Sequence, residues 1–347
     1  MQRILFASLL LILCVSPLWS EQLDRYVAID NVCAWPNLTQ LKDGSLTATI
    51  FNRPHHGKGE GDVELWASSD GGHFWKRRGT VTSHKPGTVR MNVAAGRAHD
   101  VSLVVLNSGW GGPTFRERIL DPLVSRSSDG GKTWQESFSL TAPAGTQYII
   151  PFGDIVQGPG KMLAASIYDW RIPQESSRKS TSYLIFSRDD GKTWGEAVEI
   201  AADDYNETAL VRLKSGRWLA AIRTHEDAHM DLSSSEDEGR SWSLSGPVSL
   251  PRQHPGHLLE LSDGRVLLTY GIRERGHYGI GYRVSGDQGR TWNAPEHLTH
   301  LEGTKDGGYP ATLQLDDGTL VTAYYSNGVV QHRRYHMGVI RWKMPDR

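Results

Sequence analysis

The sequence predicts an all-β protein, a six-bladed β-propeller with four-stranded antiparallel blades. Two repeated patterns support this prediction, together with a composition rich in turn residues, with 37 Gly and 16 Pro among 347 residues. The first pattern is Ser-x-Asp-x-Gly-x-x-Trp. The second is an apolar run, a turn that contains Gly, and another apolar run. Repeated units of roughly 40–60 residues that each contain several short strands are typical of propeller blades.

The Ser-x-Asp-x-Gly-x-x-Trp pattern, called the Asp box, indicates a β-hairpin turn. The Asp carboxylate can accept hydrogen bonds from backbone N–H groups of the turn, Gly supplies a positive φ, and Trp packs beneath. These Asp residues are therefore structural and are not catalytic candidates. The five copies are 68–75, 127–134, 187–194, 235–242 and 285–292.

The second pattern lies upstream of most Asp boxes and predicts a hairpin between the first two strands of each unit. Asp-Gly between aliphatic runs is a strong hairpin signal, so each unit has hairpins after its first and third strands. The copies are 41–46, 213–218, 261–266 and 315–320, and 157–161 has the same role in the third unit.

The last predicted blade has no Asp box. It begins at Tyr309 and ends with the apolar strand 336–342, and residues 24–30 would add its outer strand and close the ring. No linker or change in composition divides residues 21–347, so the sequence predicts one propeller domain there.

Residues 1–20 resemble a secretory signal peptide, with Arg3 before an apolar run that ends at Ser16-Pro17. That run is too short to cross a bilayer, so we expect a secreted or periplasmic protein with no membrane span once the signal is removed. Removal would take away Cys14 and leave Cys33 alone, which excludes an internal disulfide.

The charge balance of 38 basic and 39 acidic residues gives no reason to expect nucleic acid as a partner. We expect no cofactor and no metal, and the composition leaves the oligomeric state open. The loops opposite the Asp-box turns are rich in Arg, His and Trp. Such a rim suits a polar, anionic or sugar-like ligand, and we expect a glycan or oligosaccharide.

The Asp boxes and the six-unit layout resemble the sialidase (neuraminidase) superfamily over essentially the whole of residues 21–347. The resemblance implies three arginines that hold the substrate carboxylate, an Asp acid/base, and a Tyr nucleophile assisted by a Glu. A Tyr replaces the usual carboxylate nucleophile because the acid group on the sugar would repel a second carboxylate.

Two segments match this pattern. Asp306-Gly-Gly-Tyr309 opens the last blade as the nucleophile strand of the family does, so the resemblance implies Tyr309 as the nucleophile. Segment 206–223 is similar to the family's Glu strand and the Arg that follows it, which implies Glu207 as the assisting carboxylate and Arg223 as a substrate-binding arginine.

Other segments depart from the family. Ala34 stands where the first Arg is expected, and Gly57 stands where the acid/base Asp is expected. The third Arg position falls near Arg275, with His277 closest in register, and Arg53 is a candidate replacement for the first Arg. The acid/base role stays open among the residues of one loop, with His56 and Asp62 as catalytic candidates and His55 and Glu60 beside them as candidates for the same role or for substrate binding.

The sequence therefore predicts a secreted, exo-acting glycoside hydrolase of the sialidase type, whose terminal sugar need not be ordinary sialic acid. Two alternatives remain: a non-catalytic carbohydrate-binding propeller, and a polysaccharide lyase that acts on uronic-acid glycans. His225-Glu-Asp-Ala-His229 matches the zinc-protease pattern, but that pattern needs a helix. It lies here in a short loop between predicted strands, so we do not expect a zinc site.

Overall fold

The computed structural model describes residues 24–115, 117–146, 148–170, 179–225 and 229–345. Over these ranges the regular secondary structure consists of β-strands, which confirms the predicted all-β class. The predicted signal peptide, residues 1–20, lies outside the described residues. In the part of the chain that is described, no helix is long and apolar enough to cross a membrane.

Four of the sheets contain four strands each, as predicted for single units. The first comprises β2 (Asn37–Gln40), β3 (Leu46–Phe51), β4 (Val63–Ser68) and β5 (Lys76–Thr82). The second comprises β14 (Tyr205–Arg212), β15 (Trp218–Thr224), β16 (Met230–Ser235) and β17 (Ser243–Pro247). The third comprises β18 (Gln253–Glu260), β19 (Val266–Ile272), β20 (Gly279–Ser285) and β21 (Glu296–His300). The fourth comprises β1 (Asp24–Asp30), β24 (His336–Trp342), β23 (Leu320–Ser326) and β22 (Gly308–Gln314).

The remaining strands form one eight-stranded sheet, which is a difference from the prediction of separate units. One half comprises β6 (Thr88–Arg97), β7 (Leu103–Gly111), β8 (Arg118–Ser127) and β9 (Gln135–Ser137). The other half comprises β10 (Tyr148–Gln157), β11 (Leu163–Trp170), β12 (Ser182–Ser187) and β13 (Gly195–Ala201). A short parallel pairing of β6 with β10, from Gly153–Ala94 to Ile155–Gly96, joins the halves.

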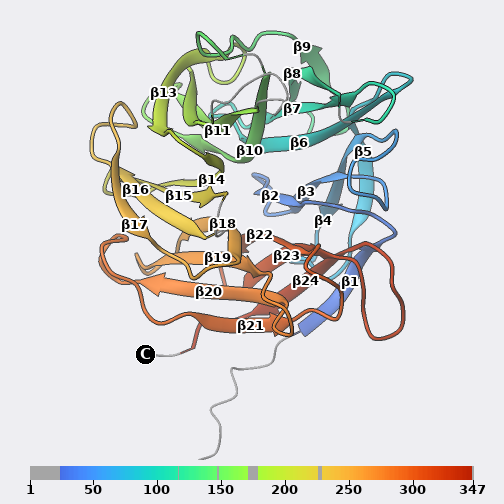
Figure 1. Ribbon diagram of the computed structural model, residues 1–347, viewed down its shortest axis with the longest axis vertical. Helices are drawn as coiled ribbons and strands as arrows, with labels where there is room; N and C mark the ends of the chain where they lie inside the picture. Colours follow the sequence, from blue (N-terminus) through green and yellow to red (C-terminus); the bar gives the residue numbers. More distant parts are fainter. Residues whose placement is uncertain (1–23, 116, 147, 171–178, 226–228, 346–347) are drawn as a thin grey trace, which may run out of the picture.

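The first strands of these units, β2, β6, β10, β14, β18 and β22, lie nearest the middle of the molecule, and the last strands lie at its periphery (Figure 1). The predicted contribution of residues 24–30 to the last sheet is confirmed, because β1 pairs antiparallel with β24 from Asp24–Arg341 to Asp30–His336. Strands from the two ends of the chain therefore share one sheet.

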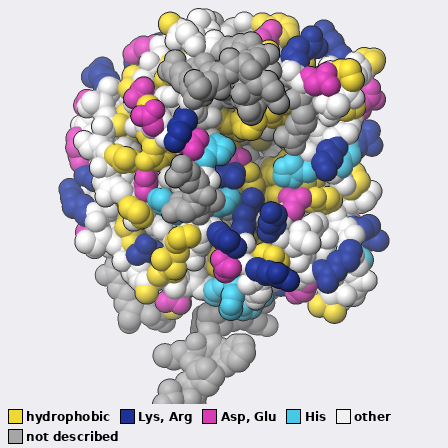
Figure 2. Space-filling view, in the orientation of Figure 1, with side chains coloured by type: hydrophobic (Ala, Val, Ile, Leu, Met, Phe, Trp, Pro, Cys, Tyr) yellow, Lys and Arg dark blue, Asp and Glu magenta, His cyan; other side chains and the backbone are white. Residues whose placement is uncertain are grey.

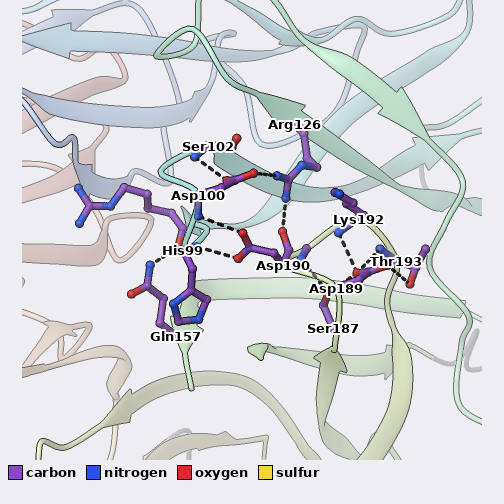
Figure 3. Close-up of polar contacts among 12 residues, drawn as sticks. His99, Asp100, Ser102, Arg126, Gln157, Ser187, Asp189, Asp190, Lys192 and Thr193 are labelled. Carbon is purple, nitrogen blue, oxygen red and sulfur yellow. Dashed lines mark hydrogen bonds and ion pairs between the residues drawn. The ribbon is translucent and has the colours of Figure 1, made fainter. Parts of the chain in front are cut away.

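The Asp-box turns have the predicted hydrogen bonds, as the third copy shows (Figure 3). The Asp189 carboxylate accepts the Ser187 hydroxyl at 2.9 Å and the backbone N–H groups of Lys192 and Thr193 at 3.1 and 2.9 Å. The Trp194 indole N–H donates to the Gly191 carbonyl at 3.3 Å, and the ring is buried in a hydrophobic cluster built from strands of both halves of the eight-stranded sheet. Each box thus stabilises a turn and supplies core volume.

Asp190 in the same turn connects neighbouring units. Its carboxylate accepts the backbone N–H groups of His99 and Asp100 at 2.7 and 3.0 Å, from the turn between β6 and β7 (Figure 3). Arg126 of β8 donates to the Asp190 carbonyl and, at 2.9 Å, to the Asp100 carboxylate. These bonds hold the rim turns of adjacent units together at the end of the sheets that carries the Asp boxes.

Cys33 is buried and carries a free thiol. Burial raises the pKa of this thiol well above its usual value, and the Asp306 carboxylate adds to the rise. Cys33 is therefore a core residue, packed in the cluster that also contains Ala34 and Phe51.

Candidate active site

The first strands reach the middle of the molecule with an irregular backbone. Five of them have a shift in strand register close to their first residues, and such bulges turn side chains out of the regular alternation. The residues inside these shifts are Asn92 in β6, Gly153 and Asp154 in β10, Asn206 and Glu207 in β14, His254 and Pro255 in β18, and Tyr309 and Pro310 in β22. Glu207 and Tyr309 therefore owe their direction to bulges that the sequence pattern did not predict.

Tyr309, Glu207 and Arg223 form one hydrogen-bonded cluster. The Tyr309 hydroxyl donates to Glu207 Oε1 at 2.5 Å, and Arg223 Nη1 donates to Glu207 Oε2 at 2.5 Å. Glu207 lies near the start of β14 and Arg223 near the end of β15, so the hairpin of one unit supplies both side chains. Tyr309 comes from β22. The structure brings these three sequence-predicted residues into direct contact.

The electrostatics of this cluster follow from its burial and its partners. Burial raises the pKa of Glu207, but the Arg223 guanidinium and the hydrogen bond from Tyr309 outweigh it, so the net pKa is lowered and Glu207 is a carboxylate at neutral pH. Burial also raises the pKa of Tyr309, and the negative charge of Glu207 adds to the rise. The phenol is therefore protonated at rest, with its proton directed at a carboxylate that can accept it.

Arg273 lies over the ring of Tyr309, with its guanidinium carbon 5.2 Å from the ring centroid. It follows the last residue of β19 directly, as Arg223 follows Ile222 in β15. Sequence reasoning favoured the later Arg275 and His277 in this loop and missed Arg273 as the cluster residue. The repeated Ile-Arg pair, Ile222-Arg223 and Ile272-Arg273, is the signal that could have identified it.

Tyr309 has a φ of 51°, in the left-handed region that a bulky residue rarely adopts. Such strain costs on the order of 1–3 kcal/mol and is concentrated at functional sites. Phe152 and Tyr325 pack against the ring, with centroids 6.0 and 5.6 Å away, and hold it in this position.

Two cavities meet at this cluster, and Figure 2 shows a hollow near the middle of the same face. The inner cavity has a volume of about 250 Å³ and is lined by Tyr309, Glu207 and Arg223 with aromatic side chains that include Trp35, Trp110 and Trp170. The outer cavity has a volume of about 860 Å³ and is mostly basic. Arg223 and His56 line both cavities.

His56 belongs to the loop in which the acid/base group was expected. Its Nδ1 lies 3.2 Å from Asp306 Oδ1, and its ring contacts Trp35 edge-on at 4.8 Å. Asp306 also accepts the hydroxyl of Tyr325 at 2.6 Å and the hydroxyl of Tyr335. Burial raises the pKa of Asp306, but the hydrogen bonds from His56, Tyr325 and Tyr335 outweigh it and hold the pKa well below its usual value, so a carboxylate orients the His56 ring.

Asp62 and Glu60 lie outside the lining of both cavities. Asp62 accepts the backbone N–H of His84 at 2.8 Å. The same carboxylate oxygen lies 2.7 Å from the ring Nδ1 of His84. Glu60 accepts the backbone N–H of Gly87 at 2.8 Å and lies 3.4 Å from His84. Both carboxylates therefore stabilise the loop that leads to β6 and lie away from the Tyr309 cluster.

Of the other sequence-predicted residues, one lines a cavity and three do not. His55 lines the outer cavity, and burial lowers its pKa. Arg53, Arg275 and His277 are exposed and lie outside both linings, so none of them takes the place of a missing arginine here. Ala34 is buried and lines the inner cavity, which leaves that wall apolar.

The inner cavity contains a second cluster of polar side chains, which the sequence did not predict. The Asp154 carboxylate accepts Asn37 Nδ2 at 2.8 Å through one oxygen and lies 2.9 Å from His257 Nε2 through the other. These residues come from β2, β10 and β18, which are far apart in the chain. The contact arises from the arrangement of the first strands around a common middle.

The His225…His229 segment is not helical at its described ends. Asn206 Nδ2 lies 2.6 Å from His225 Nε2, whereas His229 Nε2 lies 2.9 Å from Asp231 Oδ1, so the two rings have different partners. Residues 226–228 lie outside the described ranges. Among the described residues there is no group of three or more His, Cys, Asp or Glu side chains arranged to hold a metal ion.

Comparison of this chain with known proteins shows the family to which its sequence is similar. The BNR repeat-like domain family matches residues 44–322. A sialidase of Bacteroides fragilis is 23% identical over 218 residues, which cover 59% of this chain and 39% of the relative. A sialidase of Micromonospora viridifaciens is 24% identical over an alignment that covers 92% of this chain and 54% of the relative. The chain thus spans about two fifths and about half the length of these two proteins.

Solved structures agree on the fold. A protein of unknown function from Dyadobacter fermentans superimposes with a TM-score of 0.80 at 21% identity, covering 93% of this chain and 98% of that one. The Hadza microbial sialidase Hz136 superimposes with a TM-score of 0.70 at 17% identity, covering 91% of this chain and 66% of that one. At these identities the similarity shows the propeller fold.

Proposed function

The chain belongs to the BNR repeat-like domain family, within the sialidase superfamily, and we propose that it is an exo-acting glycoside hydrolase that removes a terminal acidic sugar from glycans. The observation that carries this proposal is the contact of the Tyr309 hydroxyl with Glu207 Oε1 at 2.5 Å, beside an arginine and in a cavity. A protein that only binds sugar has no need for a phenol aimed at a buried carboxylate.

In the proposed reaction the Tyr309 oxygen attacks the anomeric carbon while Glu207 accepts the phenol proton. The bond to the leaving oxygen breaks, and that oxygen takes a proton from His56. Water then attacks the glycosyl-tyrosine, His56 accepts a proton from the water, and Glu207 returns its proton to the phenol. The sugar would leave with retained configuration because two displacements occur at one carbon.

Arg223 and Arg273 would bind the carboxylate of the sugar. Both guanidinium groups line the outer cavity beside Tyr309, and Arg223 also lines the inner one. Two arginines with Ala34 in place of a third make a weaker clamp than the family pattern implies, which is why the proposed substrate is an acidic, sialic-acid-like sugar that need not be sialic acid itself.

His56 is the proposed proton donor. An imidazole can both give and accept a proton in one catalytic cycle. The Asp306 contact at Nδ1 orients the ring, and the ring lines both cavities, where the leaving oxygen would lie.

Two expectations from the sequence accompany this function. We propose that the six four-stranded units form a closed six-bladed ring over residues 21–347, with the β1–β24 pairing as its closure. We also propose that residues 1–20 direct the chain to a secreted or periplasmic location, where a glycan is the partner.

The test is incubation of the purified protein with fluorogenic sialosides and with uronate-containing glycans, with released sugar and ultraviolet absorbance followed together. The proposal expects free acidic sugar without an unsaturated product, and loss of this release in Tyr309→Phe. An unsaturated product would mean a lyase. Binding without any product would mean a carbohydrate-binding propeller.

A further inference from the structure

The outer cavity has an excess of positive charge that a single sugar carboxylate does not use. Five Lys or Arg side chains line it, against one carboxylate, that of Asp306; the five are Lys58, Arg223, Arg252, Arg273 and Lys305. His55, His56 and His254 line it as well. Figure 2 shows basic and His side chains around the hollow on this face.

Three of these five cations have no ion-pair partner among the described residues. Asp306 already accepts bonds from Tyr325 and Tyr335 and contacts His56. Arg223 pairs with Glu207, and Arg252 lies 3.4 Å from the exposed Glu274. Within the described ranges, no Asp or Glu oxygen lies within 4.0 Å of the charged nitrogens of Lys58, Arg273 or Lys305.

Two buried side chains beside the cavity, Arg273 and His254, show the effect of this low neutralisation. The Nε and Nη2 groups of Arg273 are buried with no hydrogen-bond acceptor among the described residues. Burial lowers the pKa of His254 to about 2, and the charges of Arg223 and Arg273 contribute to the decrease. The cavity thus disfavours a further cation, as expected for a site that binds anions, and Arg273 beside it has donor groups without a protein acceptor.

The basic side chains form two tiers. Arg223 and Arg273 are partly buried beside Tyr309, whereas Lys58, Arg252 and Lys305 are exposed at the mouth of the cavity. The inner tier is sufficient for the carboxylate of the sugar that is cleaved. The outer tier then faces whatever is attached to that sugar, because the leaving group extends from the anomeric carbon toward the opening.

We propose that Lys58, Arg252 and Lys305 form a second anion subsite, which binds a negatively charged group carried by the glycan next to the cleaved sugar. This inference rests on the proposed function, since it needs an acidic sugar at Tyr309. It names the substrate class as glycans with adjacent acidic sugars. Exposed ion pairs are weak one by one, and two or three of them together give about a tenfold preference.

The experiment measures binding to Tyr309→Phe, in which turnover is blocked, by isothermal titration calorimetry. The ligands are two matched pairs, α2,3-sialyllactose against α2,8-disialyllactose, and galacturonic acid against digalacturonic acid. We expect the dianion of at least one pair to bind about tenfold more tightly. The preference should fall below about threefold in 0.5 M NaCl, where the Debye length is only about 4–5 Å, and in Lys58→Ala/Lys305→Ala added to Tyr309→Phe.

The matched control is Lys132→Ala/Lys192→Ala in the same background. It removes two exposed lysines from Asp-box turns, outside the lining of both cavities, and should keep the full preference. Equal affinity for both members of each pair, no binding of either dianion, or a preference that survives Lys58→Ala/Lys305→Ala would overturn the subsite.

The subsite and the proposed function fail separately. Release of sugar by the wild-type protein without a dianion preference would leave the hydrolase and remove the subsite. A preference that depends on Lys58 and Lys305, in a protein that releases no sugar from any glycoside, would leave the subsite and remove the hydrolase.

Discussion

At the scale of single residues, Glu207 links the proposed chemistry to the proposed binding. One carboxylate oxygen accepts the Tyr309 phenol and the other accepts Arg223, each at 2.5 Å. The pKa of Glu207 is lowered by Arg223 and Tyr309 against the effect of burial, and it therefore holds a charge that accepts the phenol proton. In the proposed reaction Glu207 is the base toward the nucleophile, a role that an amide cannot take.

Glu207→Gln is therefore expected to lower kcat/KM by about 100- to 10,000-fold, the range that a positioned general base contributes. The control is Glu199→Gln, an exposed carboxylate on β13 that lies outside both cavity linings. Steady-state kinetics with the glycoside that the wild type cleaves measure kcat/KM for the wild type and both variants. Wild-type kcat/KM in Glu207→Gln would contradict the assignment.

His254 should make the protein sensitive to acid. Its folded pKa is lowered from 6.5 to about 2, mainly by burial and then by Arg223 and Arg273. Between these values the unfolded chain binds a proton that the folded protein does not, so stability decreases as the pH falls below 6.5. At about 1.4 kcal/mol per pH unit, the loss by pH 5 is about 2 kcal/mol.

Urea unfolding of the wild type and of His254→Asn at pH 7 and pH 5 measures this loss. The wild type should lose about 2 kcal/mol more than His254→Asn between the two pH values. Equal losses would mean that His254 is protonated or exposed in the folded state.

The sequence predicted Tyr309, Glu207 and Arg223 because the segments that contain them resemble the family's motifs, and the structure brings the three side chains into contact. The sequence did not show that His56 meets Asp306, since 250 residues separate them and nothing local specifies the contact. Arg273 was passed over because the family's third-arginine position falls near Arg275, with His277 closest in register. The structure instead places the arginine at the end of the preceding strand.

At the scale of secondary-structure elements, the repeats predicted the strands and hairpins but not the bulges. A register shift depends on how a strand meets its neighbours near the middle of the molecule, and the alternation of side chains does not encode it. Every one of the five shifts places at least one residue in a cavity lining, Asn92, Asp154, Glu207, His254 and Tyr309 among them. The irregular parts of the sheets thus build the site.

The parallel contact between β6 and β10 depends on a glycine. A Cβ atom on Gly96 would lie 2.5 Å from the Ile155 carbonyl oxygen and 2.9 Å from Ile155 Cβ. Gly96→Ala should therefore lower the free energy of unfolding by about 1–3 kcal/mol, as overpacking does. Gly286→Ala is the matched control because nothing lies within 4 Å of its Cβ position. If denaturant unfolding shows both variants at wild-type stability, β6 and β10 move apart to make room for the added methyl group without a loss of stability.

At the scale of the whole molecule, the two ends of the chain meet in one sheet. Ile29 in β1 is buried, and Tyr26 packs against the same hydrophobic cluster. The sequence predicted this pairing because the last unit lacks its fourth strand and residues 24–30 can supply it. It did not predict the merging of two units into the eight-stranded sheet, which comes from contact between first strands.

Removal of residues 1–30 should therefore lower Tm by more than about 5 °C relative to a chain that begins at residue 21, because it exposes the edge of β24 and the apolar surface beneath β1. Differential scanning calorimetry of both chains measures the difference. The same Tm in both chains would show that β1 does not contribute to the stability of the fold.

Tyr309 is the proposed nucleophile, and strands that are far apart in the sequence bring it to Glu207 and Arg223. The most direct measurement uses a fluorinated analogue of the sugar that the protein releases, chosen so that the glycosyl-enzyme forms faster than it is hydrolysed, followed by intact-mass and peptide mass spectrometry. We expect one added glycosyl unit, on the peptide that contains Tyr309, and none in Tyr309→Phe. An adduct on another residue, or an unmodified protein that still releases the natural sugar, would contradict it.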